Sequence, residues 1–238
     1  MGLFDSLFKK KTAPAPVKQA CTPQTELYGL PAVQLPDGLQ GEALLKIWKE
    51  ADRSYGHPVI ILRDEMLEEM LTEFNVGSYR PGPLPDIDAY LAPYIKELEE
   101  PEQFEYLMGS PEDTGDAVRF FLSPGLSTAP RWLVWVPVGQ PWEIFEKLPI
   151  GGWNDCPDAN HMAAYCRKVY GSCGAVPALI SGENLEMVPE RRPTAEEAFP
   201  MALDMYGFCT DIVTQGVGTI CALADTLLRS DIWYFWWD

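Results

Sequence analysis

The chain has 238 residues, 47% of them hydrophobic and 12% aromatic, and a formal net charge of -17 at pH 7. A chain of this length can bury a substantial core as one large domain or two small ones, and it has no apolar run long enough to predict a membrane-spanning helix. The excess of acids argues against nucleic acid and stable membrane insertion and favours basic partners.

Residues 1–36 are expected to precede the globular part of the chain. Four apolar residues at helical spacing and three closing lysines make Met1–Lys11 an amphipathic segment. So short a helix is marginal in water, which leaves two interpretations, a tail that is disordered or ordered by a partner and a weak peripheral contact with a membrane surface. The five prolines between Thr12 and Pro36 predict a linker.

The first half of the globular part, residues 37–138, alternates helical and strand patterns. Expected here are a helix over Gly41–Ser54, a buried strand over Pro58–Leu62, a helix capped by Asp64 and ending near Phe74, a helix in two pieces from Ile87 to Met108, and strands over Val118–Leu122 and Arg131–Val138. Ser123–Gly125 predicts a turn after the first of these two strands.

The second half, residues 139–238, continues the alternation. Expected are a short helix or turn over Trp142–Leu148, a helix over Pro157–Tyr170, a hairpin of Val176–Ser181 with Asn184–Val188, a helix from the Thr194–Glu197 capping box to Cys209, a helix over Val217–Arg229 and an aromatic strand at the end. We therefore predict an α/β or α+β domain, with a mixed sheet flanked by helices.

The final run, Trp233 to Trp237, alternates three aromatic rings on one side with two on the other. Apolar residues on both faces predict a strand buried in the sheet. A faint similarity between Ser54–Leu62 and Ser172–Ile180 also suggests an alternative organisation, two helix–strand halves over residues 37–138 and 139–238.

The acidic charge is concentrated in residues 64–116, which hold fifteen acids against Arg80 and Lys96. Its densest part contains Glu97, Glu99, Glu100 and Glu102. A solvated face that aids solubility is one interpretation, and a docking surface for a basic protein is the other.

The segment Gly151–Pro157 suits a sharp turn that leads into a helix. Two glycines free the backbone, Trp153 can bury its ring while its N–H finds a carbonyl, and Asn154 or Asp155 can cap a helix that Pro157 begins. The catalytic alternative makes Cys156 a nucleophile at a helix N-terminus, with His161 one turn further on but no visible group to orient it.

A second segment, Asp211–Gly218, precedes the last predicted helix. We expect a loop locked by Asp211 and Gln215 through bonds to nearby backbone, and an anion site at Gly216 and Gly218 is the alternative. Six cysteines without a C-x-x-C pair and only two histidines predict neither a metal site nor a cofactor. Without the pattern of a secretory signal, we expect reduced thiols and a cytoplasmic protein.

Taken in order, these two segments and the aromatic end resemble a bacterial family known as domain of unknown function 4253. The resemblance covers about residues 140–238 and, more loosely, residues 38–62. It implies membership of the family but no reaction, and so no catalytic residues. The matched positions are Gly152, Trp153, Cys156, Pro157, Asp211, Gln215, Gly216, Trp233, Phe235, Trp236, Trp237 and Asp238.

Two functional hypotheses follow from the sequence. The first is a non-enzymatic module that binds a basic protein through its acidic surface, for example an immunity protein that neutralises a basic toxin. The second is an enzyme with a cleft built from Cys156, Asp155 and Asp211.

Overall fold

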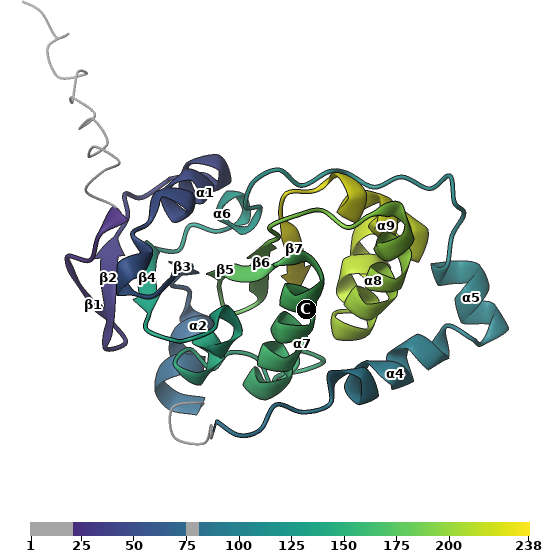
Figure 1. Ribbon diagram of the computed structural model, residues 1–238, viewed down its shortest axis with the longest axis horizontal. Helices are drawn as coiled ribbons and strands as arrows, with labels where there is room; N and C mark the ends of the chain where they lie inside the picture. Colours follow the sequence, from purple (N-terminus) through teal and green to yellow (C-terminus); the bar gives the residue numbers. More distant parts are fainter. Residues whose placement is uncertain (1–20, 75–80) are drawn as a thin grey trace, which may run out of the picture.

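Seven strands form one mixed sheet in the order β1-β2-β4-β3-β5-β6-β7 in the computed structural model, which describes residues 21–74 and 81–238. All neighbouring strands are antiparallel except β3 and β5, which run parallel with Ile61 opposite Ile180. The strands are β1 Thr25–Leu27, β2 Leu30–Gln34, β3 His57–Leu62, β4 Arg131–Val136, β5 Val176–Ile180, β6 Asn184–Val188 and β7 Trp233–Trp236. The prediction of a mixed sheet flanked by helices is confirmed (Figure 1).

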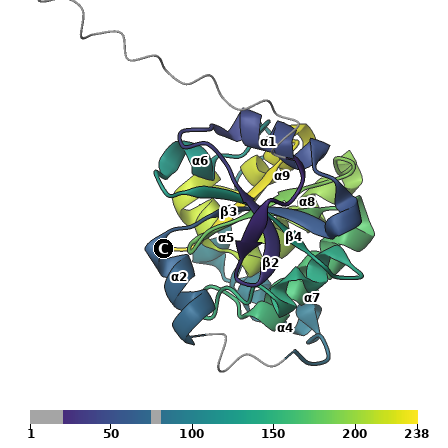
Figure 2. The same ribbon diagram turned by 90° about the vertical axis from the view of Figure 1, so that its left-hand side faces the viewer.

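Helices cover both faces of the sheet (Figure 2). The α-helices are α1 Gly41–Glu50, α2 Glu65–Glu69, α4 Ile87–Glu97, α5 Pro101–Leu107, α6 Ser123–Leu126, α7 Ala159–Cys173, α8 Ala195–Phe208 and α9 Ile220–Arg229. The 3-10 helices η2 Arg53–Tyr55 and η4 Pro141–Glu146, and the π-helical turns η3 Met70–Phe74 and η5 Ile212–Val217, complete the set. No helix in the described part of the chain is long and apolar enough to cross a membrane.

The two faces of the sheet bury different sets of side chains because residues alternate along each strand. On β3, Ile60 and Leu62 pack with α1, whose stripe of Leu44, Leu45, Ile47 and Trp48 is buried as predicted. Val59 and Ile61 point the other way, into a larger core with α2, α4, α7, α8 and α9. The sheet therefore separates a small core under α1 from a large core under the remaining long helices.

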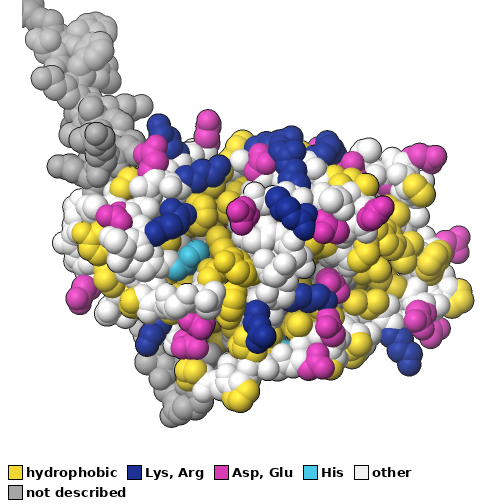
Figure 3. All heavy atoms as spheres, viewed as in Figure 1, with side chains coloured by type: hydrophobic (Ala, Val, Ile, Leu, Met, Phe, Trp, Pro, Cys, Tyr) yellow, Lys and Arg dark blue, Asp and Glu magenta, His cyan; other side chains and the backbone are white. Residues whose placement is uncertain are grey.

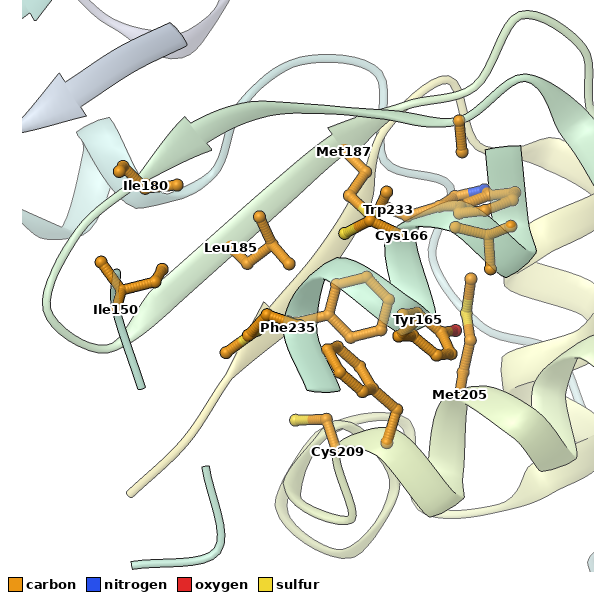
Figure 4. Close-up of a cluster of buried hydrophobic side chains, with 14 of the residues drawn as sticks. Ile150, Tyr165, Cys166, Ile180, Leu185, Met187, Met205, Cys209, Trp233 and Phe235 are labelled. Atoms are coloured by element: carbon orange, nitrogen blue, oxygen red, sulfur yellow. The ribbon is translucent and has the colours of Figure 1, made fainter. Parts of the chain in front are cut away.

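The aromatic end of the chain belongs to the large core, as predicted. Trp233 is 2% exposed and Phe235 is fully buried, and Figure 4 shows Phe235 close to Tyr165 within this core. The Tyr165 ring stacks on Phe208 at 3.8 Å between centroids, and Phe235 meets both rings edge-on. Tyr234 and Trp236 point to the other face, where they are half-buried because β7 is an edge strand.

Helix boundaries agree with several local signals in the sequence. Asp64 accepts a hydrogen bond from Leu67 N at 2.8 Å, and Thr194 with Glu197 forms the predicted capping box. The predicted break near Pro101 separates α4 from α5. The prediction for Met1–Lys11 lies outside the described residues.

Part of the predicted linker is instead a hairpin. β1 and β2 join through Tyr28 and Gly29, which both have positive φ (54° and 72°), the geometry of a type I′ turn. The sequence signal was weak because Tyr rarely takes this conformation and Pro31 lies within β2. Pairing with β4 places Ala32 in the core, so residues 25–34 belong to the domain.

The predicted strand over Val118–Leu122 is wrong. Residues 109–122 form a long segment without helix or strand, here called the strap, which crosses the molecule from α5 to α6 (Figure 1). Val118 N donates to Ser230 Oγ at 2.9 Å and Val118 O accepts from Asp231 N at 2.8 Å, so its backbone bonds go to a loop rather than a strand. The predicted Ser123–Gly125 turn is the first part of α6.

The division into two helix–strand halves stays a prediction. β3 and β5, the strands that the faint repeat relates, are the parallel pair. The helices that precede them, α1 and α7, pack on opposite faces of the sheet. A duplication would therefore require one helix to have changed face.

Candidate functional site

The Gly151–Pro157 segment makes a tight turn ahead of α7. Gly151 and Gly152 have φ of 86° and 81°, and a Cβ on Gly151 would lie 2.0 Å from Pro157 O. Gly152 N donates to the carbonyls of Cys156 and Pro157, both at 3.1 Å. The turn therefore needs glycine at both places, since only glycine adopts these angles without strain.

Three details of this turn differ from the prediction. Neither Asn154 nor Asp155 caps α7, because Asp158 does, accepting from Asn160 N and His161 N at 2.9 Å each. Pro157 accordingly precedes the cap instead of opening the helix. The Trp153 ring packs against the large core, but its buried Nε1 has no hydrogen-bond partner among the described residues.

Polar residues from all three family-like segments meet at Asp238. Asn154 Nδ2 donates to Asp238 O at 3.2 Å, and Asp238 N donates to Asp211 Oδ2 at 3.1 Å. Gln215 Nε2 donates to Asp211 Oδ1 at 3.0 Å. Asp211 and Gln215 thus lock their loop, but through Asp238 and each other rather than through nearby backbone. We call Asn154, Asp211, Gln215 and Asp238 the motif cluster.

The thiols beneath the motif cluster are sealed in the core. Cys156 is 6% exposed, and burial raises the pKa of its thiol well above the usual value. Cys209 is 1% exposed, burial raises its pKa to about 12, and its Sγ donates to Trp236 O at 2.9 Å. A buried, protonated thiol is a poor nucleophile at neutral pH. Asp155 is exposed, so the three residues of the enzyme hypothesis do not share one environment.

His161 has an orienting partner that the sequence did not reveal. Its Nδ1 lies 2.9 Å from Asp158 Oδ1, and its ring lies 4.3 Å from the Tyr90 ring between centroids. Burial alone would raise the pKa of Asp158, but the His161 side chain and the backbone N–H groups of Asn160 and His161 hold this pKa below its usual value. An N-cap that also binds a histidine in the first turn explains the pair without catalysis.

The four glutamates of the acidic segment lie apart from the motif cluster in the fold. Glu97 ends α4, Glu99 and Glu100 lie in the connection, and Glu102 is in the first turn of α5. All four are exposed. Phe104 and Tyr106 of α5 are also exposed, by 53% and 71%. We call residues 87–107, which comprise α4 and α5, the acidic arm.

A buried carboxylate, Glu186 on β6, was missed by the sequence analysis. It is fully buried, accepts from Leu122 N at 2.8 Å and from Ser123 N at 2.9 Å, and so ties the end of the strap to the sheet. Burial raises its pKa to about 7. The alternation Leu185-Glu186-Met187 predicts a solvent-facing glutamate, and no local signal shows that the strap covers this face.

No group of three His, Cys, Asp or Glu within residues 21–74 and 81–238 is arranged to hold a metal ion. The described geometry defines a mixed α/β domain whose distinctive polar residues bind one another. Residues 132–238 match the family model described as domain of unknown function (DUF4253), which is the family that the three segments resemble. No curated protein and no solved structure matches the chain.

Proposed function

We propose that the protein is a non-enzymatic, cytoplasmic binding module whose acidic arm holds a basic protein, and that neutralising a basic toxin is the concrete form of this activity. The observation that carries the proposal is the pairing of exposed aromatic rings with exposed carboxylates on α5. Aromatic residues supply much of the binding energy at protein interfaces, and surrounding charges select the partner.

The densest acids of the arm have no basic partner within residues 21–74 and 81–238. Some other acids form ion pairs, such as Asp231 with Arg192 at 2.6 Å and Asp204 with Lys168 at 2.7 Å, and Asp88 at the start of the arm also pairs with Lys168. Glu97, Glu99 and Glu100 form no ion pair with any described residue. Unpaired like charges at this density repel one another and produce a field that speeds the approach of a basic partner.

The surface of the arm fits this role. Figure 3 shows hydrophobic and acidic side chains interspersed at the right-hand end of the molecule, where Figure 1 places α5, while most Lys and Arg side chains lie toward the centre and left. α5 makes few contacts with the rest of the domain, so its rings are free to pack into a partner.

The test compares two variants of equal net charge. The arm variant reverses Glu97, Glu99, Glu100 and Glu102 to Lys, and the control variant reverses the exposed Glu26, Glu42, Glu50 and Glu146 to Lys. A protein captured from the source cell's lysate should be basic, should bind the control variant, and should bind the arm variant at least about tenfold more weakly. Its association rate with the native chain should fall steeply with salt.

Combining Phe104→Ser with Tyr106→Ser tests whether the exposed rings of α5 contribute to binding. This double variant should keep the salt-dependent association rate and dissociate faster, because charges steer the encounter and packed rings hold the complex. Capture of only acidic partners or nucleic acid, or equal loss of binding in the arm and control variants, would show that the arm is not the docking surface.

A further inference from the structure

A cavity of about 440 Å³ lies beneath the strap. The strap residues Gly115 and Val118 cover it, Leu223 and Leu227 of α9 line one side, and the edge strand β7 lines another with Trp233 from one face and Trp236 from the other. The sides formed by α9 and β7 lie within the part of the chain that matches the family model, and the strap lies outside it. The cavity is therefore built from two segments that the sequence alone does not connect.

The size and the lining of this cavity are those of a small-molecule site. Protein interiors hold few voids larger than a water molecule, whereas ligand sites span roughly 300–1,000 Å³ and are mostly apolar with a few polar groups. Ile212, Val217 and Ile232 add to the apolar lining. Its volume is sufficient for a small aromatic molecule.

Two buried polar groups in the lining have no partner among the described residues. They are Thr226 Oγ1 and Trp233 Nε1, on side chains 7% and 2% exposed. Other tryptophans, such as Trp135, also have unpaired Nε1 atoms, but Trp233 and Thr226 are the unpaired groups that line this cavity. Because an indole N–H can only donate, an occupant that satisfies it must carry a hydrogen-bond acceptor.

The charge at the edge of the cavity indicates a second feature of the ligand. Asp116 is exposed and lines the cavity, and Tyr234 and Trp236 present half-buried aromatic rings to it. A carboxylate and aromatic rings together favour a cation. The net charge of -17 adds a field that repels anions.

We propose that the cavity beneath the strap binds an aromatic amine that carries a hydrogen-bond acceptor on its ring. The ring lies between the α9 leucines and the β7 tryptophans, the acceptor meets the Trp233 N–H, and the ammonium group lies beside Asp116. This site is separate from the acidic arm, and its occupancy requires neither a toxin nor any other protein partner.

The strap provides a route into the cavity. It has no regular secondary structure. Beside the cavity, Gly115 N donates to Asp225 Oδ2 at 3.0 Å and Gly115 O accepts from Arg229, while Val118 N donates to Ser230 Oγ at 2.9 Å and Val118 O accepts from Asp231 N and Ile232 N. Segments without a helix or a strand ladder open locally at lower cost than packed helices. A ligand can therefore enter without unfolding of the sheet.

Titration calorimetry on the full chain tests the proposal with three probes, 5-methoxytryptamine, tryptamine and 5-methoxyindole-3-acetate. The first should bind saturably and the third should bind at least about tenfold more weakly, because its carboxylate faces Asp116. Tryptamine lacks the ring acceptor and should bind with intermediate affinity. No saturable binding of 5-methoxytryptamine, or equal affinity for the amine and the acid, would overturn the proposal.

Variants locate the binding. Val118→Phe should fill the cavity and weaken binding of 5-methoxytryptamine at least about tenfold, while Ala117→Phe, whose neighbouring position does not line the cavity, should leave it unchanged. Asp116→Asn, at an exposed position that folding does not require, should weaken the amine about two- to fivefold and strengthen the acid. Unchanged affinities in both Val118→Phe and Asp116→Asn would place the amine elsewhere.

Discussion

The motif cluster and the acidic arm use their charged and aromatic residues in opposite ways. In the motif cluster both oxygens of Asp211 accept hydrogen bonds, and the rings beneath it are sealed in the core. In the arm the carboxylates are exposed and two rings face solvent. The segments within the family match therefore bond to one another and maintain the fold, whereas the arm, which lies outside that match, exposes its side chains to solvent.

The largest loss of stability is expected when Trp233–Asp238 is removed. Losing three buried rings at about 3–5 kcal/mol each would exceed or match a typical total stability of about 5–15 kcal/mol. The truncated chain should show no cooperative unfolding by circular dichroism and should aggregate. A truncated chain that melts cooperatively near the native temperature would show that the aromatic strand is dispensable.

Comparison of the native chain with Glu186→Gln should reveal a pH-dependent contribution to stability at the junction of the strap and the sheet. Burial raises the pKa of Glu186 to about 7 from 4.5, so the folded state holds a proton that the unfolded state releases between these values. The contribution to stability is present below pH 4.5 and is lost as the pH rises through 7. The native chain should lose up to about 3 kcal/mol relative to the variant over this window.

Urea unfolding of both proteins at several pH values measures this difference. Burial lowers the pKa of His57 to about 4 from 6.5, so His57 contributes stability above pH 6.5 that is lost as the pH falls through 4. This opposing contribution is present in both proteins and cancels in their difference. A difference in unfolding free energy that does not vary with pH would mean that the pKa of Glu186 is the same in the folded and unfolded states.

Asp211→Ala should cost about 1–3 kcal/mol of stability, because it leaves Asp238 N and the Gln215 amide without their acceptor. Thermal unfolding measures the loss, and Gln215→Ala, which removes only one of the two contacts, should cost less. Equal stability of Asp211→Ala and the native chain would mean that solvent replaces the cluster's hydrogen bonds without penalty.

Cys156→Ser should cost about 1–2 kcal/mol, because a hydroxyl replaces a thiol in an apolar site, and should leave binding of the partner unchanged. Alkylation at neutral pH, followed by mass spectrometry, should modify the partly exposed Cys21 and Cys221 before the buried Cys156. Rapid, selective modification of Cys156 with loss of activity in the Ser variant would favour the enzyme hypothesis instead.

The smallest effect on stability is expected for the arm. Reversing Glu97, Glu99, Glu100 and Glu102 to Lys should change the unfolding free energy by less than about 1 kcal/mol, since exposed charges contribute little. Four substitutions in the arm should thus perturb the fold less than Asp211→Ala alone. Denaturant unfolding checks this, and a large loss would assign the arm a structural role.

Local patterns in the sequence predicted most elements. The α1 stripe, the Asp64 and Thr194 caps, the β5–β6 hairpin and the inward rings of β7 depend on residues close together in the chain, and each is present in the structure. The sequence by itself also identified the family through three ordered segments, since their residue types and order are visible without any fold.

Only the tertiary structure decided which residues meet. Asn154, Asp211 and Asp238 are far apart in the chain, and sheet order and helix packing bring them together. The strap covers both Glu186 and a cavity. The local sequence pattern instead predicts a strand within the strap and a solvent-facing Glu186. Periodicity reports which face of an element is apolar, but coverage by a distant segment depends on long-range contacts that local residue choice does not encode.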